Sequence, residues 1–362
     1  MTDTHVPIQA IKGRGTAERT PHRFEKEVRT AFDDAWGTLQ EAAAAPAPRL
    51  QTEVRFEEAR SAISRNDSPD IPFDYGLNPY RGCEHGCVYC YARPTHSYLN
   101  LSPGLDFETK IIAKRNIAAV LRADLARRGY VPKLINIGSA TDCYQPAERE
   151  LRLTRGVIDV LRQARHPFSL VTKSSGVERD IDLIAPMAAD KLAAVYVTIT
   201  TLDAELARKL EPRAAAPHRR LRTIEALAAH GIPVGVSLAP QIPFVNEDME
   251  QVLRAAWEAG ARSAFYCIVR LPWEVAPIFK QWLELHYPRR AARIMARIQE
   301  MRGGAGNNSD FATRMRGEGV WADLIGQRFA IACRRLGYNR VRTELDLSQF
   351  RAPQLSGQSS LF

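Results

Sequence analysis

Apolar, strand-like runs that alternate with amphipathic segments constrain the fold of this chain of 362 residues more than any other feature. Five such runs follow residue 107, and each is apolar on both faces. They are 133–139, 168–174, 192–201, 232–240 and 263–271. Strands that are apolar on both faces are typical of a parallel sheet covered by helices. The pattern therefore predicts an α/β fold.

Segments with apolar residues at helical spacing separate these runs. They are 116–129, 153–165, 219–231 and 247–260. Three of them close on Gly129, Gly231 or Gly260, where a helix favours glycine just after its last turn. A short strand near Tyr75 to Tyr80 would complete six β/α units. No GxGxxG motif follows a strand, so we expect a partial (β/α)6, TIM-like barrel and not a Rossmann sheet.

Three regions of the chain differ in composition. Residues 1–70 are polar and include the low-complexity stretch 41–50, which predicts an N-terminal extension that is partly flexible. Residues 71–300 carry the β/α pattern and form the predicted core domain. In residues 301–362 the pattern weakens to helix with a Gly/Asn break at 302–310, which predicts a C-terminal helical extension and a flexible tail.

Composition restricts the setting and the partners of the protein. No run of 18 or more uncharged apolar residues occurs and no secretion signal precedes the core, so we expect a cytoplasmic protein with no membrane partner. The six cysteines are too sparse for a disulfide framework. The net charge of +9 fits an anionic partner such as nucleic acid, although the basic residues are scattered along the chain.

Three of the cysteines, Cys83, Cys87 and Cys90, lie within the stretch RGCEHGCVYCYARPTH. A structural zinc site needs a fourth ligand, which His85 or His96 would supply. An iron–sulfur cluster also accepts thiolates at such close spacing, and three thiolates leave one of four irons without a protein ligand. Full ligation suits simple electron transfer, so an open iron favours chemistry at the cluster.

The CxxxCxxC spacing, with Tyr89 before the last cysteine and a parallel α/β domain after it, resembles the radical S-adenosylmethionine (radical SAM) superfamily. The stretches NPYRGCEHGCVYCYARPTH, TDCYQPAERELRLTRGVIDVL and VTKSSGVERDIDLI resemble the branch that includes spore photoproduct lyase and its uncharacterised, DNA-repair-photolyase-like relatives. The resemblance spans about residues 70–300. It implies a 4Fe–4S cluster on the three cysteines, S-adenosylmethionine as cosubstrate, and reduced flavodoxin or ferredoxin as electron donor.

The resemblance also implies roles for six further side chains. Tyr89 matches an aromatic residue near the adenine, with loop packing as its alternative role. Lys173 matches a lysine that pairs with the cosubstrate carboxylate, although a lysine at a strand end also reaches solvent. Ser139, like the nearby Thr141, falls where the amino group of S-adenosylmethionine binds in the family, but the usual acidic GGE motif is absent. Thr198 and Thr200 could reach ribose hydroxyls, or belong in their strand for packing alone.

Cys143 is a candidate catalytic residue. Spore photoproduct lyase returns a hydrogen atom from a cysteine in this loop, but our alignment puts that position at Ser139, four residues earlier. This departure puts activity on spore photoproduct in doubt. We expect Cys143 to donate hydrogen or to guard a radical, or else to pack as a small hydrophobe. Glu211 and Arg213 suggest an internal ion pair and have no assigned role.

The last five residues, Gln358 to Phe362, resemble the Q-x-x-L-F peptide that docks bacterial DNA-processing proteins on the sliding clamp. A frayed terminus is the alternative. Together these patterns predict a radical SAM enzyme, of a lyase-like or repair-like kind, that acts on nucleic acid or a nucleotide. The alternatives are a zinc-stabilised nucleic-acid-binding protein and a non-catalytic iron–sulfur protein.

Overall fold

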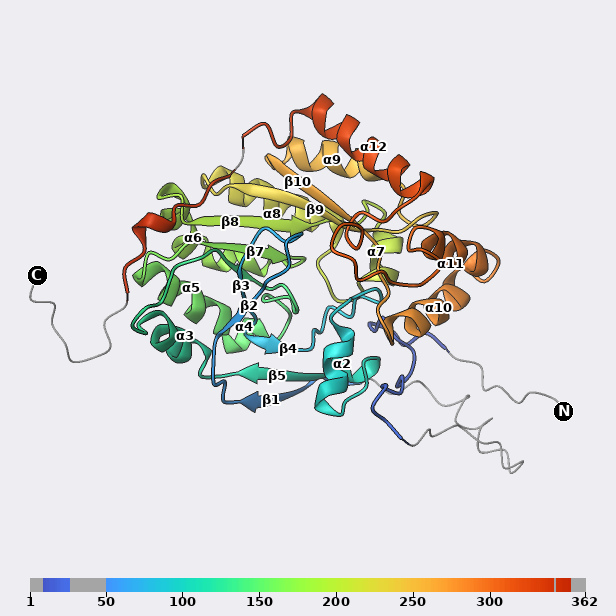
Figure 1. Cartoon of the computed structure of the whole chain (residues 1–362), viewed down its shortest axis with the longest axis horizontal. Helices are drawn as coiled ribbons and strands as arrows, with labels where there is room; N and C mark the ends of the chain where they lie inside the picture. Colours follow the sequence, from blue (N-terminus) through green and yellow to red (C-terminus); the bar gives the residue numbers. More distant parts are fainter. Residues whose placement is uncertain (1–8, 27–49, 342, 353–362) are drawn as a thin grey trace, which may run out of the picture.

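A sheet of seven strands lies at the centre of the protein, as Figure 1 shows. The computed structural model describes residues 9–26, 50–341 and 343–352. The strand order is β10-β9-β8-β7-β6-β3-β2, and all neighbours are parallel except β2 and β3. The strands are β2 (Ile63–Arg65), β3 (Tyr75–Leu77), β6 (Ile135–Ile137), β7 (Phe168–Thr172), β8 (Ala193–Thr198), β9 (Val234–Gln241) and β10 (Ser263–Ile268).

Helices connect the parallel strands. The main ones are α3 (Ile117–Leu125), α5 (Leu153–Gln163), α6 (Ile181–Ala189), α8 (Pro217–Ala229) and α9 (Met249–Glu258). All but α6 coincide with predicted amphipathic segments. Six parallel strands with intervening helices confirm the predicted partial (β/α)6 architecture. The ladder ends at β10 and β2, so the described residues form no closed barrel.

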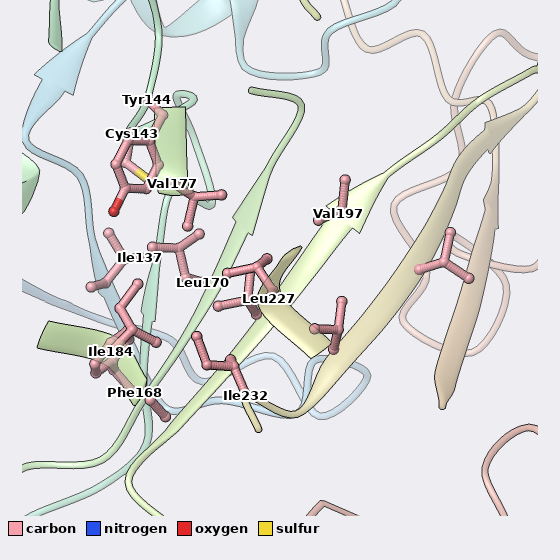
Figure 2. Packing of buried hydrophobic residues seen from close by; sticks show 14 of the residues in the cluster. Ile137, Cys143, Tyr144, Phe168, Leu170, Val177, Ile184, Val197, Leu227 and Ile232 are labelled. Carbon is pink, nitrogen blue, oxygen red and sulfur yellow. The ribbon is translucent and has the colours of Figure 1, made fainter. Parts of the chain in front are cut away.

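The two faces of the sheet differ in what they contact. Val195 and Val197 of β8 belong to the main hydrophobic core, together with Ile224 and Leu227 of α8. Figure 2 shows Val197 and Leu227 within this core. Because side chains alternate along a strand, Tyr196 and Thr198 lie on the opposite face. We call this face, which points away from the helices, the inner face of the sheet.

A second, three-stranded sheet has the order β1-β5-β4. Its strands are β1 (Glu53–Glu57), β4 (Tyr80–Arg81) and β5 (Lys110–Lys114), with β1 parallel to β5. Both β1 and β2 come from residues 1–70, where the sequence pattern carried little fold signal. The shorter helices are η1 (Arg93–Leu99), α2 (Leu105–Thr109), α4 (Glu148–Leu151), η2 (Ser175–Asp180), α7 (Ala204–Leu210) and η3 (Leu347–Gln349).

Three further helices follow β10: α10 (Val275–His286), α11 (Ala291–Glu300) and α12 (Val320–Leu336), of which only α12 lies within residues 301–362. The loop before α12 lies along β10, where Ile268 N donates to Met315 O over 2.9 Å. Arg314 of this loop binds both carboxylate oxygens of Asp70, at 2.5 and 2.6 Å. Because Asp70 lies between β2 and β3, this ion pair joins the two ends of the open sheet.

None of the helices in the described ranges is long and apolar enough to cross a membrane. The tail that resembles a clamp-binding peptide, Gln358 to Phe362, lies outside the described residues. The domain boundaries at residues 70 and 300 stay predictions.

Candidate functional site

The cysteine loop follows β4 and is built from tight turns. Gly82 and Gly86 adopt the left-handed conformation, with φ of +77° and +65°, which costs glycine nothing. The backbone amide of Gly86 donates to Cys83 O at 3.3 Å, and that of Cys90 donates to Cys87 O at 3.2 Å. The three thiols are therefore held in one compact loop.

The environment of the thiols is mostly apolar. Cys83 and Cys87 are 7% and 8% exposed, and Cys90 is half-buried. Burial raises the pKa of Cys87 to about 12, although the ammonium of Lys173 opposes this shift. Within the described residues, no three His, Cys, Asp or Glu side chains converge closely enough to hold a single metal ion. Three thiols within one compact loop fit the ligand set of an iron–sulfur cluster.

Arg93 fixes the backbone of the cysteine loop. We call the part of the site around Arg93 and Glu108 the back of the loop, and the part around Tyr89 and Glu211 its front. Its side chain has no exposed surface, and it donates to Cys87 O at 2.9 Å and to Gly86 O at 3.1 Å. It also binds two carbonyls in the loop before α2, and it forms an ion pair with Glu108 at 2.6 Å. All its donors are used inside the protein, so Arg93 defines the path of the chain between the first two turns.

The N-terminal segment 9–26 packs against the same side of the loop. The carboxylate of Glu108 accepts from the amide of Gly15 at 2.9 Å, and from the amide and hydroxyl of Thr16 at 3.1 and 3.0 Å. A Cβ atom on Gly15 would lie 1.8 Å from Gly86 O. Sequence reasoning missed this contact, because a single Gly-Thr pair in a polar segment carries no recognisable signal.

On the front of the loop, Tyr89 belongs to a network around the buried Glu211. The Tyr89 hydroxyl donates to the Glu211 carboxylate, which also accepts from the Thr200 hydroxyl at 3.0 Å and pairs with Arg220. Burial alone would raise the pKa of Glu211, but Arg220 and Lys173 lower it below its usual value. Lys173 Nζ lies 5.9 Å from the centre of the Tyr89 ring. An ionised Glu211 thus orients both Tyr89 and Thr200.

Asp142 links this front side to the ends of β6 and β7. It accepts from the hydroxyl of Thr172 and from the amide of Lys173, both at 2.7 Å, and lies 3.2 Å from His85 Nδ1. Burial opposes ionisation, but His85 and these hydrogen bonds hold the pKa of Asp142 well below its usual range. Asp142 follows β6, at the carboxyl end of the sheet, where parallel α/β folds carry chemistry.

Ser139 and Tyr91 lie where the ends of the sheet meet the cysteine loop. Asn78 Nδ2 donates to Ser139 Oγ at 3.3 Å, and the hydroxyl of Tyr91 donates to Ser139 O. The guanidinium of Arg270 lies 4.5 Å from the centre of the Tyr91 ring. Tyr91 thus connects the end of β6 with the segment that follows β10.

Cys143 lies away from this site. Figure 2 shows it beside Tyr144 and Ile137 in the main core, where it has no exposed surface. Burial raises the pKa of its thiol well above the usual value. The placement favours packing, and the hydrogen-donor role stays a prediction.

The other candidates are distributed as follows. Thr198 is buried on the inner face of β8, and its carbonyl accepts from Arg220 at 2.9 Å. Arg213 pairs with Glu84 at 3.2 Å and not with Glu211. His96 Nε2 lies 3.1 Å from Lys110 O, and burial lowers the pKa of this ring to about 4. The structure therefore brings Tyr89, Lys173 and Thr200 together beside the cysteine loop, with Thr198 and Ser139 at neighbouring strand ends and Cys143 apart.

Comparison with known proteins decides the family. Residues 77–256 match the Radical SAM superfamily. An uncharacterised protein of Mycobacterium tuberculosis is 36% identical over 246 residues, which cover 66% of this chain and 72% of that protein. The chain belongs to the radical SAM superfamily. An uncharacterised protein of Methanocaldococcus jannaschii is 28% identical over 214 residues, which cover 59% of this chain and 76% of its own.

Solved structures of spore photoproduct lyase share the fold of this radical SAM protein. One mutant of that enzyme has a TM-score of 0.52 and 14% sequence identity, with 86% of each chain covered. Another, with bound AdoMet and dinucleoside spore photoproduct, has a TM-score of 0.51 and 14% identity, covering 86% of this chain and 84% of its own. As a member of the superfamily, the chain has a 4Fe–4S cluster and S-adenosylmethionine as its cofactors.

Proposed function

We propose that the protein is a radical SAM enzyme that acts on nucleic acid or a nucleotide, in a lyase-like or repair-like reaction. When bound, the cluster and S-adenosylmethionine supply a 5′-deoxyadenosyl radical that abstracts hydrogen from the substrate. The observation that carries the proposal is the compact loop of Cys83, Cys87 and Cys90 at the ends of the parallel strands. The cationic Lys173 and the Tyr89 network face its front.

The chain's own residues would bind and orient the cosubstrate. Burial would lower the pKa of Lys173, but Cys87 and Glu211 raise it above its usual value, so the ammonium stays protonated and suits a carboxylate. Tyr89, held through its hydroxyl, offers a ring face to adenine. We assign the smaller polar contacts, to the amino group and the ribose, to Ser139, Thr198 and Thr200.

Charge and likeness support the choice of substrate. The net charge of +9 favours a polyanion, and the guanidinium of Arg270 lies on an aromatic ring near the cysteine loop. A neighbour in fold binds a dinucleoside photoproduct. Reduced flavodoxin or ferredoxin is our proposed electron donor, the cytoplasm our proposed location, and the tail Gln358 to Phe362 our proposed sliding-clamp contact.

Anaerobic reconstitution with iron and sulfide tests the cluster. We expect a brown protein with about four irons per chain. Cys87→Ala should lose most of the iron, whereas Cys333→Ala, which alters a buried cysteine on α12, should retain it. A colourless protein that holds one zinc per chain would instead support a zinc-stabilised binding protein.

The second step tests the chemistry. The reduced protein, incubated with S-adenosylmethionine, should release 5′-deoxyadenosine, which chromatography detects. A fully reconstituted cluster that releases none would support the alternative of a non-catalytic iron–sulfur protein.

A further inference from the structure

Phe265 is an exposed aromatic residue on the inner face of the sheet. Strand register aligns Thr198 with Ser237, and Ser237 with Phe265. Aligned residues of neighbouring strands point to the same face, so Phe265 shares the inner face with Thr198. With strands roughly 4.8 Å apart, it lies about 10 Å from Thr198 along the sheet. The ring is 41% exposed, although most of the sheet is buried.

The orientation of Phe265 is fixed by its neighbours. The ring of Tyr196 meets it edge-on, with centroids 5.5 Å apart and planes at 61°. Tyr196 lies directly over Gly235, where a Cβ atom would come within 2.4 Å of the tyrosine ring. Glycine at this position therefore lets Tyr196 lie flat across β9 and support Phe265. Such a support holds the partly exposed phenyl ring in one orientation.

The inner face of the sheet carries small and polar side chains. Ser237 separates Phe265 from Thr198, and Asn136 and Ser169 of the same face are hydrogen-bonded to each other at 2.9 Å. Five residues after Phe265, Arg270 forms no ion pair among the described residues and rests on Tyr91. An apolar ring within a polar face, followed by a cation near the cysteine loop, matches a ligand with a planar ring and a phosphate.

We propose that Phe265, supported by Tyr196, is the stacking surface for a nucleobase of the substrate. The inference rests on the proposed function and narrows its substrate to one that places an unstacked base on the inner face, at the level of the sheet where Thr198 lies. Base stacking on an aromatic side chain tolerates any base and contributes a large share of single-strand affinity. Arg270, past the end of β10, then faces a phosphate of the same substrate.

Oligonucleotide binding by the reconstituted protein tests this assignment. The probes are a labelled strand of eight thymidines and the same strand with two central abasic sites, and the readout is fluorescence anisotropy. The unmodified protein should bind the first probe more tightly. Phe265→Ala should weaken that binding about tenfold and abolish the difference between the probes. Phe265→Tyr should keep both the affinity for the first probe and the difference between the probes. Phe56→Ala, which removes an exposed ring on β1, should change neither the affinity nor the difference.

Two outcomes would overturn the assignment. One is equal binding of both probes by the unmodified protein, and the other is unchanged discrimination in a Phe265→Ala protein whose melting temperature and iron content are normal. Either can occur while the protein still forms 5′-deoxyadenosine. If the unmodified protein formed no 5′-deoxyadenosine, the proposed function itself would be contradicted. Failure of the stacking proposal and failure of the proposed function are therefore distinguishable.

Discussion

Two buried arginine–glutamate pairs flank the cysteine loop, Arg93–Glu108 behind it and Arg220–Glu211 in front. Their side chains are almost fully buried, with exposures of 0% and 0% in the first pair and 1% and 0% in the second. The two pairs nevertheless bind different kinds of group. Arg93 also donates to backbone carbonyls of the loop, whereas Glu211 accepts hydrogen bonds from the side-chain hydroxyls of Tyr89 and Thr200.

The comparison shows that a buried ion pair can hold the backbone of a loop in place, or can orient the side chains that line a site. A buried pair is by itself weak evidence for stability, but removal of one partner leaves an uncompensated buried charge. We therefore expect substitutions at the back of the loop to lower stability and iron content together. Substitutions at the front should slow cleavage of the cosubstrate and leave the iron content unchanged.

The largest effect should come from Arg93→Leu. The change leaves Glu108 buried without its cation, and we expect a loss of about 3–5 kcal/mol in the free energy of unfolding, together with most of the iron. Denaturant unfolding and iron analysis measure these losses. Arg115→Leu, which alters an exposed pair with Glu58, is the control and should cost little. Normal iron content in Arg93→Leu would refute the path-fixing role.

Gly15→Ala tests the contact that the N-terminal segment makes with the loop. The added methyl group meets Gly86 O at 1.8 Å, so the segment must move away, at a cost of about 1–3 kcal/mol. Thermal unfolding and the rate of iron loss to a chelator report this change. Gly156→Ala, whose new Cβ atom meets nothing nearer than 3.5 Å inside helix α5, should not lower the unfolding temperature and should leave the rate of iron loss unchanged.

Tyr89→Phe should have a smaller effect, confined to the front. It removes one hydrogen bond to Glu211, which costs about 1 kcal/mol, and frees the ring to reorient. We expect normal iron content but slower formation of 5′-deoxyadenosine. Tyr144→Phe removes a comparable buried hydroxyl, bonded to Asp180 at 2.9 Å, and should leave the product rate unchanged. Equal rates in the two variants would contradict the orienting role of Glu211.

Cys143→Ala should have the smallest effect. The thiol packs in the core, so we expect a loss of roughly 1 kcal/mol in the free energy of unfolding and unchanged cleavage of S-adenosylmethionine. Assay of a nucleic-acid substrate then separates the two roles. Altered turnover would assign hydrogen donation to Cys143, and unchanged turnover would leave it a packing residue.

Local patterns in the sequence predicted the architecture well. Strands β6 to β10 and their helices follow from apolar periodicity, because each element buries a face that its own residues define. The cysteine spacing indicated the cluster loop, because ligands so close in sequence remain close in any fold. Both features depend on neighbours along the chain.

Other features depended on the assembled sheet. Gly15 and Glu108 are 93 residues apart, and no local pattern shows that they meet. Residues 264–269 are all apolar, so only the register with β9 places Phe265 on the inner face. Cys143 lies just after a strand, where catalytic residues of parallel α/β folds often lie. The structure nevertheless places its side chain in the main core.

The sequence by itself therefore determined the parallel α/β architecture and the three cysteines, because backbone periodicity and short spacing are local properties. The tertiary structure alone decided which buried charges hold that loop and which rings face inward. Those contacts join residues far apart in the chain, and their geometry exists only once the strands have paired in register.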